Sequence, residues 1–205
     1  MTDGLIATLL AFFVVTVSPG PANIAVAAVS AGQGRRKGLL FAFGLTVGLA
    51  FWGVIAATGV GAVLHTASHA LVVLKVIGGV YLLWLAVQSA RSVTAPKGEG
   101  DLDTGRGLWF WRGLMLNLSN PKAVIAWMAA LSMGLGVDAG PTMLVFTTGA
   151  CMALGAVNYG GYALVFSAPG AMKAYRRTRR WIDGTVAFLF AGAGLGLLRS
   201  ALARS

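Results

Sequence analysis

Long apolar runs separated by short polar stretches dominate this sequence. A transmembrane helix needs about 20 mostly apolar residues to cross the hydrocarbon core of a bilayer. We expect such helices over residues 5–29, 38–64, 70–90, 108–135, 141–168 and 184–202. No stretch shows the sustained alternation of apolar and polar residues that marks a membrane strand. The pattern therefore predicts an all-α membrane protein with six transmembrane helices.

The basic residues gather in alternate polar stretches. The first, third and fifth loops hold most of them: Arg35, Arg36 and Lys37, then Arg91, Lys97 and Arg106, then Lys173, Arg176, Arg177, Arg179 and Arg180. Short cytoplasmic loops carry the excess of Lys and Arg in membrane proteins. We therefore expect these loops in the cytoplasm and both termini outside. The first helix is expected to be retained rather than cleaved, because no basic residue precedes it.

The composition agrees with a membrane protein and excludes several other classes. Only 11% of residues are charged, whereas a soluble domain has about 25%. The six acidic residues are too few and too scattered for the paired carboxylates of a hydrolase or for a carboxylate metal cage. A lone cysteine, Cys151, forms no disulfide within the chain. The net charge of +10 follows from the basic loops and does not require a nucleic-acid-binding face.

The chain divides into two similar halves. Residues 92–107 have the composition of a flexible cytoplasmic linker, between a three-helix repeat at 1–91 and another at 108–205. Sliding the sequence by one half places Pro21 on Pro121, and apolar residues match downstream. Each half has an odd number of spans, so the second half enters the membrane from the opposite side. We therefore expect one transmembrane domain built from two inverted repeats, an arrangement typical of secondary transporters that work by alternating access.

The first helix contains an expected break at Ser18-Pro19-Gly20-Pro21. Each proline lacks an amide hydrogen and clashes with the preceding turn, so helical carbonyls lose their donors inside the membrane. Freed carbonyls are tolerated there only where protein or a watery cavity satisfies them. The break is therefore expected to face the protein interior.

The fourth helix contains the matching break, at Asn117-Leu118-Ser119-Asn120-Pro121-Lys122. Ser119 and Asn120 are expected to bond the carbonyls that Pro121 frees. Lys122 lies deep in the span, and an ionisable residue at that depth is a functional candidate by default. If the two breaks meet, their helix N-termini offer free amides and positive dipole ends, which suit a carboxylate.

Four other features yield weaker hypotheses. Lys75, near the start of the third span, either joins the site or reaches to the surface, and Asp183, before the sixth span, either carries protons or pairs with an arginine of loop five. His65 and His69 are too few ligands for a metal site. Glycines such as Gly44 and Gly48 permit close helix packing, either within the bundle or in a homodimer.

Three stretches together resemble the LysE/RhtB family of bacterial amino-acid exporters: SPGPANIAVAAVSAGQGRRKGLLFAFGLTVG, LKVIGGVYLLWLA and FWRGLMLNLSNPKAVIAW. The resemblance implies a six-helix inner-membrane protein that exports amino acids or close derivatives and is driven by an ion gradient. It also points to Pro19, Gly20, Pro21, Asn120, Pro121 and Lys122 as site residues. One departure is that many members resemble PGPN, whereas here Ala22 follows the second proline and Asn23 comes one residue later.

The sequence thus predicts a secondary transporter that exports a neutral amino acid, threonine-like, homoserine-like or branched. None of the acids falls within an expected span, and a cationic side chain would need one. The candidate substrate-binding residues are Ser18, Pro19, Gly20, Pro21, Asn23, Asn117, Asn120, Pro121 and Lys122, with Lys75 and Asp183 for coupling or gating. The expected partners are the bilayer and a coupling proton or sodium ion, without cofactor or metal. A membrane enzyme and an ion or metal channel are the alternatives.

Overall fold

The protein is all-helical in the parts that the computed structural model describes, which are residues 2–66, 76–77, 79–80, 82–87, 90–91, 108–134 and 140–202. Predictions for the linker at 92–107, for Lys75, for His69 and for about half of the third span lie outside these residues. Two of the described helices are long and apolar enough to cross a membrane, over Arg35–Gly59 and Pro141–Phe166, and a bent pair makes a third if it is counted as one span.

The bent pair is the expected broken first span. Helix α1 (Thr2–Val17) and helix α2 (Pro21–Gln33) meet at an angle of 52° across Ser18–Gly20. Pro21 occupies the first position of α2, where its missing amide hydrogen costs nothing and its fixed φ suits the helix. The prediction of a break at the two prolines is confirmed.

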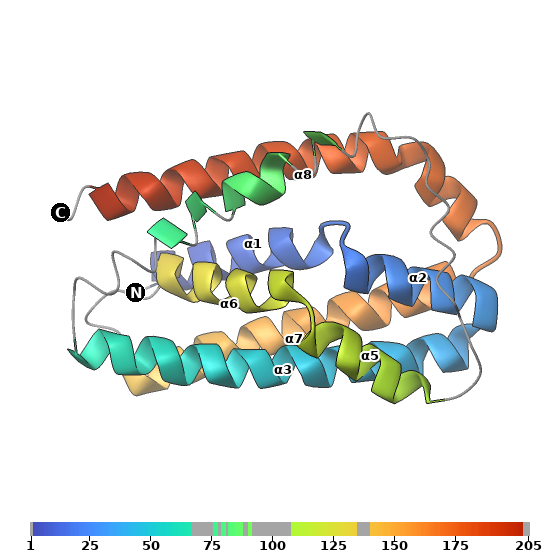
Figure 1. The fold of residues 1–205 in the computed structure, drawn as a ribbon, viewed down its shortest axis with the longest axis horizontal. Coiled ribbons are helices and arrows are strands. Elements are labelled where there is room, and N and C mark those ends of the chain that lie inside the picture. Colours follow the sequence, from blue (N-terminus) through green and yellow to red (C-terminus); the bar gives the residue numbers. More distant parts are fainter. Residues whose placement is uncertain are drawn as a thin grey trace.

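The fourth span is also divided, into α5 (Trp109–Leu118) and α6 (Pro121–Gly134). As in the first span, a proline begins the second piece. In Figure 1, α6 lies beside α1 and runs in the opposite direction, and α5 lies toward the α2 end of the molecule. The two breaks therefore come together in the middle of the structure.

Two loops are shorter than the sequence suggested. Helix α3 (Arg35–Thr66) begins directly after Gly34, whose φ of 85° turns the chain. Helix α8 (Ala171–Leu202) includes the basic residues expected in loop five. That expectation was wrong, because Lys and Arg are good helix formers and no residue between Ala171 and Asp183 interrupts the helix. Only residues 167–170 separate α7 (Pro141–Phe166) from α8.

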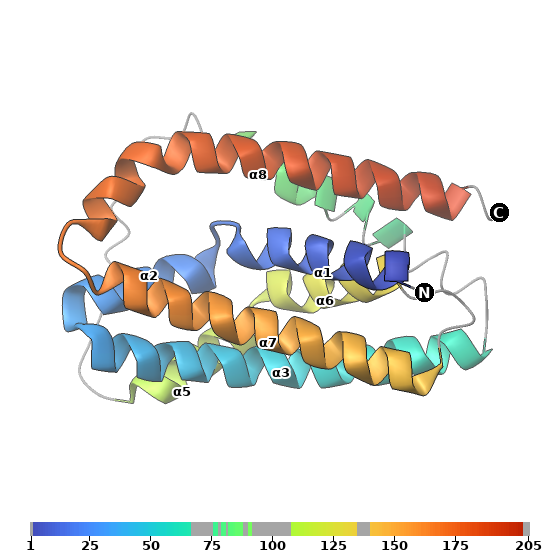
Figure 2. The same ribbon diagram turned by 180° about the vertical axis from the view of Figure 1, so that it is seen from behind.

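Close packing fixes α5 against α3. A Cβ built on Gly44 would collide with the carbonyl oxygen of Phe110, and one on Gly113 would collide with that of Phe41. The GxxxG pair in the second span therefore serves packing within the bundle. Helices α3 and α7 lie side by side in both ribbon views, and α8 lies on the opposite side of α1 (Figures 1 and 2).

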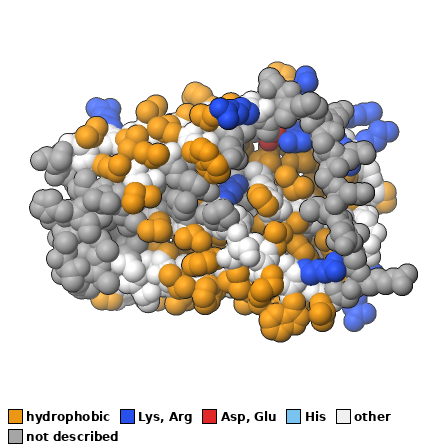
Figure 3. All heavy atoms as spheres, viewed as in Figure 1, with side chains coloured by type: hydrophobic (Ala, Val, Ile, Leu, Met, Phe, Trp, Pro, Cys, Tyr) orange, Lys and Arg blue, Asp and Glu red, His pale blue; other side chains and the backbone are white. Residues whose placement is uncertain are grey.

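Charge and hydrophobicity separate along the long axis of the molecule. The face seen in Figure 3 shows hydrophobic side chains over its middle, and most Lys and Arg side chains at the end where α3, α5 and α8 begin. Large apolar side chains such as Phe43, Phe51, Val157 and Phe188 are exposed, as lipid-facing residues are. The basic end matches the first and fifth polar stretches of the sequence.

Candidate functional site

Side chains satisfy the carbonyls freed at the first break. The Asn23 amide donates to the carbonyl oxygens of Thr16 at 2.6 Å and Ser18 at 3.0 Å. The Tyr162 hydroxyl, from α7, donates to the carbonyl oxygen of Val17 at 2.9 Å. Asn158, also from α7, donates to the Asn23 side-chain oxygen at 3.0 Å. The break is thus held by its own helix pair and by α7, as a break inside a membrane requires.

The second break is stabilised differently from the prediction. The Asn120 side-chain oxygen accepts a hydrogen bond from the backbone amide of Lys122 at 3.1 Å, so Asn120 caps α6. The freed carbonyl of Leu118 is satisfied by the indole of Trp52 on α3, at 3.2 Å. Ser119 is exposed. The expectation that Ser119 and Asn120 bond the freed carbonyls was wrong, because an asparagine before a helix is oriented toward the amides of the first turn.

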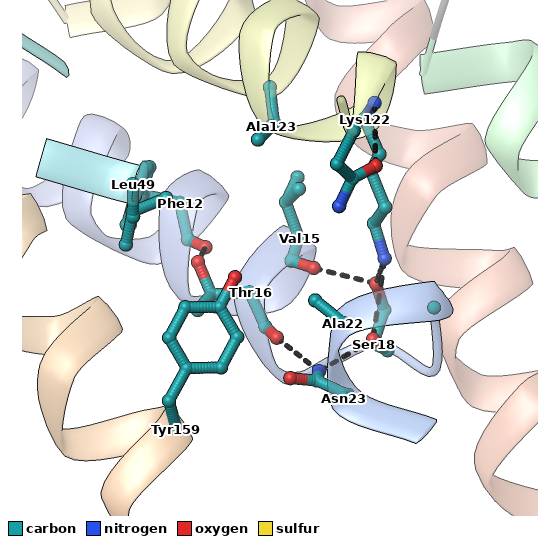
Figure 4. A pocket seen from close by; sticks show the side chains of 13 residues that line it. Phe12, Val15, Thr16, Ser18, Ala22, Asn23, Leu49, Lys122, Ala123 and Tyr159 are labelled. Carbon is teal, nitrogen blue, oxygen red and sulfur yellow. Dashed lines mark hydrogen bonds between the residues drawn. The ribbon is translucent and has the colours of Figure 1, made fainter. Parts of the chain in front are cut away.

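Lys122 connects the two breaks. Its ammonium donates to the hydroxyl of Ser18 at 2.5 Å and to the carbonyl oxygen of Ser18 at 3.3 Å. It also lies 5.9 Å from the centre of the Phe190 ring on α8, a cation–π distance. Figure 4 shows the side chain reaching from the start of α6 to Ser18. One residue therefore joins the first break, the second break and α8.

The N-terminus of α2 adds a second source of positive potential. Gly20 precedes the helix and offers no side-chain cap, whereas Asn120 caps the corresponding end of α6. A Cβ built on Gly20 would lie 2.9 Å from the Lys122 ammonium, so the glycine leaves room for the lysine. An uncapped helix start and a lysine ammonium at one point suit a small anionic group such as a carboxylate.

A small pocket extends from this point. Its volume is about 30 Å³, room for about two water molecules. Its lining residues are Phe12, Val15, Thr16, Ser18, Gly20, Ala22, Asn23, Leu49, Asn120, Lys122, Ala123, Ala126 and Tyr159, with no acidic side chain among them. In Figure 4 the polar groups near Lys122 and Ser18 lie at one side, Phe12 and Leu49 lie at the other, and Thr16 and Tyr159 lie between.

Most of the candidate residues meet here. Ser18, Gly20, Asn23, Asn120 and Lys122 line the pocket. Pro19 lies within the first break, and Pro21 and Pro121 begin α2 and α6. Sequence reasoning missed the α7 residues Asn158, Tyr159 and Tyr162, although an asparagine in an apolar span is a signal of the kind that identified Lys122.

Asn117 lies behind the pocket rather than in its wall. It is fully buried, and its amide nitrogen donates to the carbonyl oxygen of Leu45 at 2.6 Å and to the hydroxyl of Tyr159 at 3.2 Å. Asn117 therefore ties α5 to α3 and α7, and orients a residue that does line the pocket.

Asp183 pairs with Arg179, one turn earlier on α8, at 3.2 Å between Nε and Oδ2, which is one of the two roles that the sequence left open for it. Its residue is only 2% exposed, on the same face of α8 as Val186 and Phe190, both buried. Burial raises the pKa of nearby Tyr175, and the charge of Asp183 raises it further against the opposing effect of Arg179. Asp183 is thus an ion-paired residue, and it lies about two helical turns from Phe190, the residue of α8 that contacts Lys122.

Helices broken in pairs, apolar exposed faces and a polar pocket at the breaks define a membrane protein of the transporter type. Residues 13–201 match the family model described as LysE type translocator, and the chain belongs to this family. It is therefore a multi-pass membrane protein of a transporter family and not an enzyme, which sets the membrane-enzyme alternative aside.

Several relatives are named for the amino acids that they export. The chain is 30% identical over 201 residues to the threonine efflux protein of Escherichia coli K12, covering 91% of this chain and 93% of that one. It is 30% identical to the leucine efflux protein of Enterobacter sp. strain 638, with 89% and 88% covered. It is 33% identical to the homoserine/homoserine lactone efflux protein of Salmonella typhimurium, with 61% of each covered. No solved structure matches the chain.

Proposed function

We propose that this protein exports a neutral amino acid across the bacterial inner membrane, and that the pocket between the two breaks binds it. The relatives named for threonine, leucine and homoserine efflux support an amino-acid substrate. Of the residues given by the sequence, we propose Ser18, Pro19, Gly20, Pro21, Asn23, Asn120, Pro121 and Lys122 for the binding site, whereas Asn117, behind the pocket wall, would act through Tyr159.

The observation that carries the proposal is the position of Lys122 beside the uncapped start of α2. Every amino acid has a carboxylate, and that group complements both the ammonium and the free amides of the helix start. The Ser18 hydroxyl lies within hydrogen-bonding distance of the same ammonium. Because that hydroxyl donates its own hydrogen to the carbonyl oxygen of Val15 at 2.6 Å, it holds the ammonium in place, and the ammonium and the helix amides are the donors for the carboxylate.

The lining of the pocket supports a neutral substrate over a cationic one. No acidic side chain lines it, and Asp183, on α8, is already paired with Arg179. A lysine or arginine substrate would bury its side-chain cation without a partner, which is costly. The same lining argues against a metal-cation channel, because such channels use rings of acidic side chains or ordered carbonyls.

Transport would proceed by alternating access between two inverted repeats, 1–91 and 108–205, joined by a linker at 92–107. The opposite directions of α1 and α6, and the proline that begins the second piece of each broken span, support this relation. A pocket with room for about two water molecules is too small to hold threonine or leucine. The elements around it therefore have to separate on at least one side during the cycle.

The proposed six-span topology places both termini outside and the basic end of the molecule in the cytoplasm. Export against a gradient requires coupling, and a proton or a sodium ion is the candidate. Lys75 and Asp183 remain the proposed coupling or gating residues. A homodimer is a further proposed partner, because small residues in the spans permit close helix contact between copies.

The test is counterflow of radiolabelled threonine, leucine and lysine in liposomes that contain the purified protein. We expect threonine or leucine to exchange faster than lysine. Lys122→Gln should lower the exchange at least about tenfold, the effect of losing a charge-assisted hydrogen bond. Lys37→Gln is the matched control, because Lys37 is exposed, donates to the side chain of Gln33 and lies over the Trp109 ring, away from the pocket. Faster exchange of lysine, or an unaffected Lys122→Gln variant, would overturn the proposal.

A further inference from the structure

Two hydroxyls that line the pocket have complementary hydrogen-bonding capacity that no residue in the described part of the chain uses. Tyr159 on α7 and Thr16 on α1 both line the pocket. In Figure 4 the Tyr159 hydroxyl points toward Thr16, on the side away from Lys122. These two groups lie between the proposed carboxylate site and the apolar wall of Phe12 and Leu49.

The hydrogen of the Tyr159 hydroxyl is free to donate. The Asn117 amide nitrogen donates to the carbonyl oxygen of Leu45 at 2.6 Å, which fixes the orientation of that side chain. The same nitrogen donates to the Tyr159 hydroxyl at 3.2 Å, so Tyr159 is the acceptor in this contact. A phenol that accepts in this way keeps its own O–H for another partner.

Thr16 offers the opposite capacity. Its hydroxyl donates to the carbonyl oxygen of Phe12 at 2.6 Å, one turn earlier in α1. Its hydrogen is used there, and its oxygen lone pairs remain as acceptors toward the pocket. The pocket wall thus presents one donor, on Tyr159, and one acceptor, on Thr16.

We infer that Tyr159 and Thr16 form hydrogen bonds with a hydroxyl group on the substrate side chain. The pocket would therefore select small hydroxylated amino acids over their aliphatic counterparts. A hydroxyl both accepts and donates, and it satisfies the two residues at once. A methyl group leaves both buried groups without a partner, which is the arrangement that rejects an analogue most strongly. This inference rests on the proposed function and deepens it.

Asn117 is the positioning residue in this arrangement. It is held against α3 by the Leu45 carbonyl, and α5 is locked to α3 by the close approaches at Gly44 and Gly113. The Tyr159 hydroxyl is therefore oriented by Asn117, a residue on the closely packed pair of helices α3 and α5.

The test compares threonine with valine, in which a methyl group replaces the hydroxyl, by counterflow in liposomes that contain the full-length protein. Wild type should favour threonine by about five- to tenfold, the effect of one or two hydrogen bonds. Tyr159→Phe and Thr16→Val should each reduce that preference to about twofold or less while valine exchange continues. Continued valine exchange shows that the variants are folded and inserted.

Two matched controls accompany these variants. Tyr175→Phe removes a phenol outside the pocket, and Thr46→Val removes a hydroxyl that, like Thr16, donates to the carbonyl one turn earlier. Both should keep the wild-type preference. Equal exchange of threonine and valine by wild type, or an unchanged preference in both Tyr159→Phe and Thr16→Val, would overturn the inference while leaving amino-acid export intact. If no amino acid exchanges at all, both the inference and the proposed function fail.

Discussion

Lys122 occupies a position that a lysine rarely takes. Its ammonium lies beside the first turn of α2, where the helix dipole is positive. The carbonyl and hydroxyl of Ser18 and the ring of Phe190 offset part of this repulsion. No acidic side chain lines the pocket. A negatively charged ligand at this point would therefore meet two favourable partners at once.

Gly20 tests the contact between Lys122 and the start of α2. Its φ of −165° is extended backbone that alanine adopts easily, so Gly20→Ala should fold. The new Cβ would lie 2.9 Å from the Lys122 ammonium and displace it. We expect threonine affinity in counterflow to fall at least about fivefold, as for a weakened charge-assisted hydrogen bond.

Gly32→Ala, on the same helix, is the control because nothing lies within 4 Å of its Cβ. It should behave as wild type. Wild-type affinity in Gly20→Ala would show that the contact with Lys122 is unimportant for binding.

Among the helices, α7 stabilises the first break through side-chain hydrogen bonds. Asn158, Tyr159 and Tyr162 are contributed by little more than one helical turn, and two of them bond directly to the break or to Asn23. Asn23 in turn satisfies two freed carbonyls. The shape of the broken helix thus depends on a helix that is distant in sequence.

Replacement of Asn23 tests whether these hydrogen bonds stabilise the broken helix. Asn23→Leu would leave the carbonyls of Thr16 and Ser18 and the amide of Asn158 without this partner. We expect the free energy of unfolding to fall by about 2 kcal/mol, the cost of buried unsatisfied groups, seen as a lower melting temperature in detergent. Asn158→Ala loses one of these bonds and should have a smaller effect. Equal stability of Asn23→Leu and wild type would mean that water replaces the side chain.

The two breaks could be predicted from the sequence, whereas the residues that stabilise them could not. Prolines specify both breaks, and the depth of Lys122 in an apolar run marks it as functional, because both are local signals. The partners of those breaks are not local: Trp52 bonds to Leu118, and Asn158 to Asn23. Such contacts depend on how helices pack. The continuation of α8 through its basic segment was also hidden, since charge indicates topology but does not end a helix.

At the scale of the whole molecule, one end is basic and the middle is apolar (Figure 3). The residues of the basic end come from the starts of α3, α5 and α8. That asymmetry supports an orientation with this end in the cytoplasm. Helix α7 runs from the opposite end toward it (Figure 2), so its two ends should be reachable from opposite sides.

Cysteine labelling in whole cells tests the orientation. In a Cys151→Ala background, Gly140→Cys and Ala168→Cys place single exposed thiols before and after α7. A membrane-impermeant maleimide should label Gly140→Cys in intact cells, and Ala168→Cys only after permeabilisation. The reverse pattern would invert the proposed topology without affecting the site.

The central claim is that Lys122 binds the substrate carboxylate, and the most direct measurement removes either charge in turn. We would measure inhibition of threonine counterflow by threonine and by threoninamide, which lacks the carboxylate, in wild type and in Lys122→Gln. Wild type should prefer the acid at least about tenfold, and Lys122→Gln should lose that preference. If Lys122→Gln still distinguishes acid from amide as wild type does, the carboxylate binds elsewhere and the account is wrong.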